Sequence, residues 1–133
     1  MRNFESSYES IEELPVEFFE SSTLIGSDTL KEEYMDVVKK EISEGKKLDP
    51  VILYNYKNVN FIIEGNQRAG TYGILNKLVP CVVVKNEEDF QRLKKMNIKL
   101  GELINFSRLE DVHIALAEHM YNIRRDKYLE YFV

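Results

Sequence analysis

The amino-acid sequence predicts a small α/β (α+β) domain in which helices pack against one mixed β-sheet. A β-branched run at residues 51–54, a turn at Lys57-Asn58 and a second apolar run at 61–63 are typical of a β-hairpin. A third apolar run, residues 81–84, follows a segment of helical character and indicates a buried strand. Apolar residues at helical spacing lie before and after these runs, so strands and helices alternate along the chain.

The first predicted helix starts at Asp28 or Thr29. The motif Thr29-x-x-Glu32 matches a capping box, and Gly45 is a residue type that ends helices. Between these signals, apolar residues recur at helical spacing and are expected to face the core: Leu30, Tyr34, Val37, Val38 and Ile42.

Further helices are expected in the second half of the chain. One covers residues 68–77, and another runs from an N-cap at Asn86 through Met96. The last is long and begins at a second capping box, Ser107-x-x-Glu110. One face of this last helix is apolar: Leu109, Val112, Leu116, Met120 and Ile123.

The 133 residues fit a single domain with three regions. Residues 1–27 form an acidic N-terminal segment in which Val16, Phe18 and Phe19 predict a short strand. Residues 28–100 form the core, and residues 101–133 supply a C-terminal helix packed on that core.

Composition limits the classes of partner and the compartment. The net charge is −5 and the isoelectric point is near 5.2, so strong non-specific binding to duplex DNA is not expected. No apolar run is long enough to span a membrane, and the first residues do not form a secretory signal. The chain has one cysteine, Cys81, and a cytoplasmic location is therefore expected.

The segment from Ile63 to Arg68 combines three features that suit a phosphate. Gly65 permits a tight turn and close approach to the backbone. The helix that follows leaves its first N–H groups unpaired at the positive end of its dipole. Arg68 adds a planar fork that matches phosphate oxygens. Gly65, Asn66, Gln67 and Arg68 are therefore the candidate phosphate-binding turn, and Glu64 is a candidate general base or magnesium ligand.

The order of these motifs resembles the core of the ParB/sulfiredoxin superfamily, which includes ParB-like nuclease domains. The matching pieces are the segment from Gly45 to Pro50, the turn from Ile63 to Arg68 and the strand Val79-Pro80-Cys81-Val82-Val83. The resemblance implies a ParB/sulfiredoxin-like fold and a nucleotide such as CTP or ATP, with Mg²⁺, on the 65–68 turn. It argues against sulfiredoxin activity, because Asn66 occupies the position of the catalytic cysteine.

A second resemblance concerns residues 104–108. ParB proteins carry a Glu-Asn-x-x-Arg motif that helps to bind nucleotide and metal, and Ile104-Asn105-Phe106-Ser107-Arg108 is similar except for Ile104. Asn105 and Arg108 are therefore expected to lie close to Arg68 and to share its ligand. The alternative is that Arg108 pairs with a local carboxylate and faces water.

Together these features predict a stand-alone ParB-like domain that binds a nucleotide or phosphate ligand, with hydrolysis or phosphoryl transfer left open. Two other hypotheses remain: a ParB-like nuclease, and a non-catalytic module that binds a protein through the N-terminal segment or the apolar tail at 128–133. His113 and His119 lie six positions apart on one helix and are interpreted as structural or surface residues. Cys81 and Tyr72 are interpreted as core residues.

Overall fold

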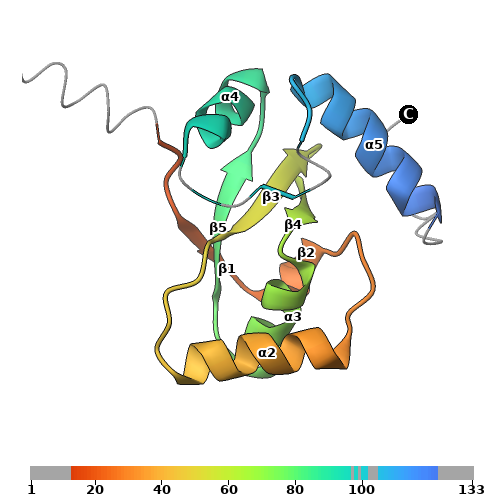
Figure 1. The fold of residues 1–133 in the computed structure, drawn as a ribbon. Coiled ribbons are helices and arrows are strands. Elements are labelled where there is room, and N and C mark those ends of the chain that lie inside the picture. The colour runs from red at the N-terminus through yellow and green to blue at the C-terminus, as the bar shows by residue number, and fades with distance from the viewer. Residues whose placement is uncertain (1–12, 97, 99, 102–104, 123–133) are drawn as a thin grey trace, which may run out of the picture.

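The computed structural model describes residues 13–96, 98, 100–101 and 105–122 (Figure 1). Five strands form one mixed sheet in the order β1-β5-β3-β4-β2. The strands are β1 Glu17–Phe19, β2 Leu24–Ile25, β3 Val51–Tyr56, β4 Val59–Glu64 and β5 Val79–Val84. The helices are α2 Glu32–Ser43, α3 Asn66–Ile74, α4 Glu87–Lys95 and α5 Leu109–Asn122, with a short 3-10 turn η1 at Ser21–Thr23. The predicted small mixed sheet packed with helices is confirmed.

The β3–β4 hairpin is closed by a two-residue turn. Lys57 and Asn58 both have positive φ, 52° and 64°, which is the conformation that matches the twist of paired strands. Tyr56 pairs with Val59 across this turn, and β3 pairs in parallel with β5 on its other side. β3 and β5 are therefore internal strands, which explains their nearly continuous apolar sequences.

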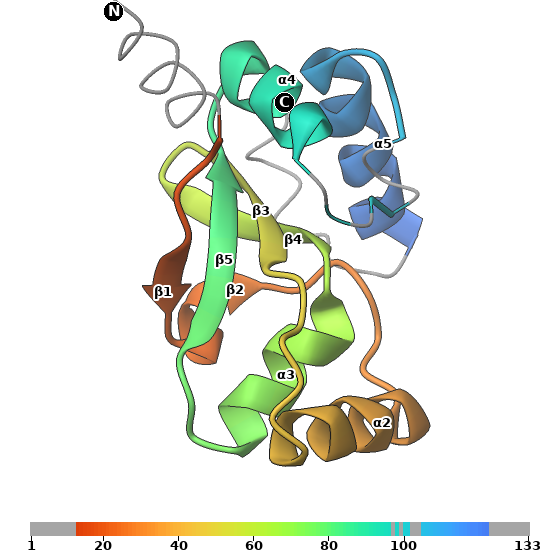
Figure 2. The same cartoon turned by 60° about the vertical axis from the view of Figure 1, so that its left-hand side comes forward.

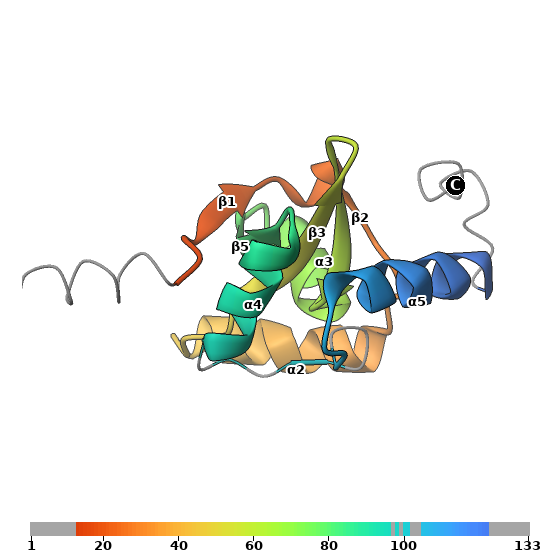
Figure 3. The ribbon, with the colours of Figure 1, turned by 90° about the horizontal axis from the view of Figure 1, so that it is seen from above.

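The two faces of the sheet are covered by different helices. Alternate strand residues pack either with buried side chains of α4 and α5 or with Ala69 of α3. Figure 2 shows the result: α4 and α5 lie toward one end of the molecule, and α2 and α3 toward the other. Seen from above, α4 and α5 are neighbours at the end of the sheet (Figure 3). None of the helices among the described residues is long and apolar enough to cross a membrane.

The start of α2 differs from the prediction. The helix begins at Glu32 with Lys31 in the capping position and no side-chain cap, so the Thr29-x-x-Glu32 capping box does not form. Hydrogen bonds from α3 hold residues 27–31 outside the helix, as described below. The predicted core face is also largely wrong, because Val38 is buried whereas Leu30, Tyr34 and Val37 are exposed.

A residue with a left-handed backbone conformation follows each of the helices α2 and α3. Gly45, with φ +74°, follows α2 as predicted, and its N–H donates to the carbonyl of Ile42. Asn76, with φ +57°, plays the same part after α3, so that helix ends at Ile74 rather than at Lys77.

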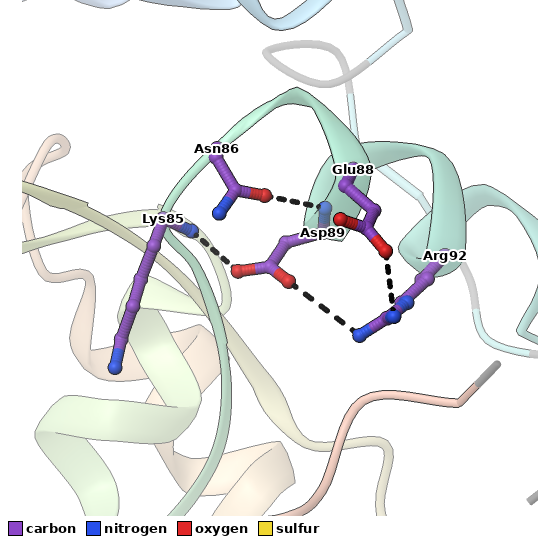
Figure 4. Close-up of polar contacts among 5 residues, drawn as sticks. All are labelled: Lys85, Asn86, Glu88, Asp89 and Arg92. Atoms are coloured by element: carbon purple, nitrogen blue, oxygen red, sulfur yellow. Dashed lines mark hydrogen bonds and ion pairs between the residues drawn. The ribbon is translucent and has the colours of Figure 1, made fainter. Parts of the chain in front are cut away.

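The N-terminus of α4 is capped as predicted. Asn86 Oδ1 accepts the N–H of Asp89 at 2.9 Å, and Asp89 Oδ2 accepts the N–H of Lys85 at 3.0 Å (Figure 4). Arg92 reaches back to Glu88, with 2.7 Å between Nη2 and Oε1. These contacts stabilise the first turn of α4.

The start of α5 also differs from the prediction. The helix begins at Leu109, two residues after Ser107, and the Leu109 N–H donates to Glu87 Oε1 of α4 at 2.8 Å. Glu87 also accepts a hydrogen bond from Gln91 Nε2 at 2.6 Å. The bond from Gln91, and then the bond from Leu109, lower the pKa of Glu87. A carboxylate of α4 therefore satisfies the first backbone donor of α5.

Replacing Asn86 with alanine is expected to destabilise the protein by about 1 kcal/mol, because the cap to Asp89 is lost. Urea denaturation measures this change. Asn86→Asp keeps the acceptor and serves as the control. An equal loss in both variants would show that the cap is not responsible.

The hydrogen bonds to Glu87 predict a pH dependence of stability. Because the pKa of the folded-state carboxyl is lowered, its contribution is present above the ordinary glutamate pKa of about 4.3 and disappears as pH falls through the folded-state pKa. Glu87→Gln should remove this part of the acid dependence. Urea midpoints of both proteins between about pH 3 and pH 6 test it. Parallel pH profiles would contradict the assignment.

Candidate functional site

The candidate site is built where β4 passes into α3. Gly65 joins the two elements with φ +103°, a conformation that side chains rarely tolerate. A Cβ at this position would lie 2.9 Å from Arg68 Nη2 and 3.1 Å from Val51 Cγ2. The turn therefore needs glycine both for its backbone angle and for the close approach of Arg68.

Arg68 folds back over this turn. Its Nη2 donates to the carbonyl of Pro50 at 3.3 Å, while its buried Nε has no hydrogen-bond partner among the described residues. A buried donor without a partner costs free energy, so this guanidinium has donor capacity that an anion would satisfy. It stands in the first turn of α3, where no side chain caps the helix.

The side chains of Asn66 and Gln67 are engaged with their own chain. Asn66 Oδ1 accepts the N–H of Ser27 at 2.9 Å, and Asn66 Nδ2 donates to Ser27 Oγ at 3.2 Å. Gln67 Oε1 accepts the N–H of Lys31 at 2.8 Å, and Nε2 donates to the carbonyl of Thr29 at 2.9 Å. The turn therefore offers a ligand its backbone N–H groups and Arg68 rather than these two amides.

Glu64 stands at the end of β4 immediately before the turn. Its Oε1 accepts the N–H of Gly65 at 3.1 Å. Its carboxylate also packs against Gly101, where a Cβ would lie only 2.0 Å from Oε2. Gly101 thus leaves room for the carboxylate between the sheet and the segment that leads to α5.

Two adjacent cavities surround the turn. The smaller, about 200 Å³, is lined by Asp28, Tyr34, Val38 and the turn itself, residues 64–68. The larger, about 430 Å³, is lined by Ser27, Asp28, Ile63, Glu64, Asn66, Gly101, Phe106, Ala115 and His119. Both cavities share Asp28, Glu64 and Asn66, so they form two lobes of one site.

Two lining residues with ionisable side chains were missed by sequence reasoning. Asp28 lines both lobes, but it was interpreted only as a helix start. His119 of α5 lines the larger lobe, although its spacing from His113 favoured a structural role. His113 has such a role: its Nδ1 lies 2.7 Å from the hydroxyl of Tyr54. No local motif marks Asp28 or His119, because only the folded chain brings them to the turn.

The structure does not bring Asn105 and Arg108 to either lobe. Both residues are exposed, and Arg108 Nη2 lies 3.7 Å from Glu110 Oε2, as in the surface alternative. The reason lies at the start of α5, whose first N–H is used by Glu87. Phe106, between them, does line the larger lobe.

Cys81 lies in the core, as expected, and Tyr72 is partly buried against it. Cys81 is fully buried on β5, and burial raises its pKa to about 12. A thiolate, the nucleophilic form of cysteine, is therefore not accessible at neutral pH. Tyr72 packs against the same buried cluster as Cys81. Neither residue takes part in the candidate site.

No protein-family model matches this sequence, and no curated protein is significantly similar to it. Similar solved structures include a conserved hypothetical protein from Pyrococcus furiosus, at 18% identity and TM-score 0.48. A free serine kinase in complex with AMP is also similar, with 17% identity and a TM-score of 0.49. Sulfiredoxin from Arabidopsis thaliana has 10% identity and TM-score 0.48.

The matched regions differ in extent. They cover 55% of this chain and 33% of the Pyrococcus protein, 55% and 32% for the kinase, and 59% and 94% for sulfiredoxin. This chain therefore spans about a third of the first two proteins. Likeness at this level concerns the fold alone and transfers no ligand or activity.

Substitution of Gly65 by alanine is expected to destabilise the protein by more than the roughly 1–2 kcal/mol that a left-handed residue costs, because the new Cβ also meets Arg68 and Val51. Gly45→Ala is the matched control, since Gly45 has φ +74° but nothing within 4 Å of a new Cβ. Chemical denaturation of both variants measures the difference. Equal losses would show that the contacts at Gly65 add nothing.

Proposed function

We propose that this domain binds a nucleotide, or a related phosphate-containing ligand, at the start of α3. The observation that carries the proposal is the small cavity at this point, where the uncapped N-terminus of α3 and Arg68 meet. Backbone N–H groups at a helix start and an arginine fork are a combination that binds phosphate oxygens. The unpaired Nε supports the same proposal, because a bound phosphate would give this donor a partner.

The carboxylates of Asp28 and Glu64 bear on whether the phosphate binds alone or together with Mg²⁺. Both line the cavity that Arg68 lines, so a bare phosphate would meet two negative charges there. Mg²⁺ removes this conflict, since it is commonly held by one or two carboxylates together with substrate phosphates. Asp28 and Glu64 are the residues that would hold it. When bound, the ion would neutralise charge on the phosphates.

The larger lobe adds groups for recognition or chemistry. Phe106 offers an aromatic surface beside the cavity, and Glu64 and His119 are candidate general bases that line it. Phosphoryl transfer or hydrolysis would use one of them to accept a proton from the attacking hydroxyl or water. Among the described residues, no three potential metal ligands cluster together, so the nuclease hypothesis has only the pair Asp28 and Glu64 as metal ligands beside the turn.

A non-catalytic interaction module is the second candidate. It is favoured by a cavity of about 600 Å³ beside the second half of α3, where Gly70, Gly73 and Ile74 line it. Three apolar side chains that line this cavity are exposed: Leu30, Ile74 and Leu78. Such a surface would suit a protein partner rather than a nucleotide.

Titration calorimetry with CTP, ATP, GTP and ADP, each with and without Mg²⁺, tests the nucleotide proposal. Binding is expected to require Mg²⁺. Arg68→Ala should weaken it by about 1.5–3 kcal/mol, the usual value of a charge-assisted hydrogen bond. Arg92→Ala, on α4 and paired with Glu88, is the control. A wild-type protein that binds no nucleotide at millimolar concentration would favour the interaction module.

The Arg108→Ala variant decides whether the predicted Asn105–Arg108 pair joins the site. Because Arg108 is exposed and close to Glu110, its loss should leave nucleotide affinity nearly unchanged. An affinity loss as large as that of Arg68→Ala would show that both arginines serve one ligand. The double variant would then lose little more than either single variant.

A further inference from the structure

We infer that Asn66 and Gln67 are positioning residues, whose side chains clamp residues 27–31 against the start of α3 and thereby shape the ligand site. The inference rests on the proposed function for the identity of the site. It departs from the expectation that these side chains contact the ligand themselves.

Four hydrogen bonds make up the clamp. Asn66 exchanges two with Ser27, at 2.9 and 3.2 Å, and Gln67 bonds the N–H of Lys31 and the carbonyl of Thr29, at 2.8 and 2.9 Å. The partners are 36 to 39 positions apart in sequence, so these are tertiary contacts. An uncharged side-chain amide can both donate and accept hydrogen bonds. Gln67 does both with the backbone of one segment, accepting from Lys31 and donating to Thr29.

Besides the clamp, two contacts hold the segment: Leu30 packs against Gly70 of α3, and Ser27 binds the carbonyl of Ile62. Residues 26–31 connect β2 to α2 and contain no helix or strand. Their one buried residue is Ser27, whose hydroxyl donates to the carbonyl of Ile62. Thr29 and Lys31 are exposed, and Gln67 binds the Thr29 carbonyl and the Lys31 N–H to α3. The Lys31 carbonyl accepts the N–H groups of Tyr34 and Met35 at the start of α2. The clamp therefore determines where the segment lies.

The position of this segment sets two walls of the site. Asp28 lies between Ser27 and Thr29, which are both bound by the clamp, and it lines both lobes. Lys31 is the capping position of α2, and Tyr34 in the first turn of that helix lines the small lobe. Asn66 and Gln67 thus place a carboxylate and an aromatic ring through the hydrogen bonds of their side-chain amides.

Amide hydrogen exchange in the free protein tests the clamp directly. Gln67→Met keeps the length of the side chain but removes both hydrogen bonds. The Lys31 amide should then exchange about tenfold faster or more, as expected for the loss of two bonds. Gln67→Glu retains the acceptor for Lys31 and should give an intermediate rate. Asn55→Ala, which breaks a side-chain bond in the hairpin, is the control and should leave Lys31 unchanged.

Affinity for pyrophosphate with Mg²⁺, a probe that carries no base, tests the positioning role. Gln67→Met should weaken binding several-fold while the backbone N–H groups and Arg68 remain. Unchanged exchange at Lys31 would overturn the clamp. Faster exchange with unchanged affinity would overturn its role in the site. A wild-type protein that does not bind the probe would instead overturn the proposed function, and the exchange rates would still decide whether the clamp exists.

Discussion

The left-handed turn at Gly65 is the constraint on which the arrangement of the site depends. It directs the chain from β4, which pairs with β3 in the hairpin, into α3 on one face of the sheet. Because the turn is tight and lacks a side chain, Arg68 can fold back over it and Glu64 can reach its N–H. The first turn of α3 then presents Asn66 and Gln67 to residues 27–31. A different backbone angle at Gly65 would separate all of these groups.

The fold could be predicted where local signals decide the structure. The hairpin, the strand around residues 81–84 and the α4 cap at Asn86 each depend on neighbouring residues. The start of α2 could not be predicted, because amides of α3 hold residues 27–31 out of the helix. Likewise, α5 begins late because the acceptor for its first N–H comes from Glu87 of another helix. Contacts between distant residues therefore override the two capping boxes.

The candidate site also has one part that local sequence predicts and another part that only the folded chain reveals. The Gly65–Arg68 turn is continuous in sequence, and its chemistry is visible from residue types alone. Asp28 and His119 become part of the site only through folding, since both lie far in sequence from the turn at residues 65–68. The similarity of residues 104–108 to a family motif predicted a convergence with Arg68 that exposure of Arg108 and its contact with Glu110 do not support. Short motifs identified the candidate phosphate-binding turn, and tertiary structure added the carboxylate of Asp28 and the imidazole of His119.

The outer strands of the sheet are much shorter than the inner ones. β1 has three residues and β2 has two, whereas β3, β4 and β5 have six each. Long unpaired edges invite another chain to add a strand, and short edges are a common protection against aggregation. β1 pairs with residues 79–81 of β5 and β2 with residues 60–61 of β4, so each outer strand offers another chain only a short edge. Any assembly of this domain through its described surface is therefore expected to use helices rather than continuation of the sheet.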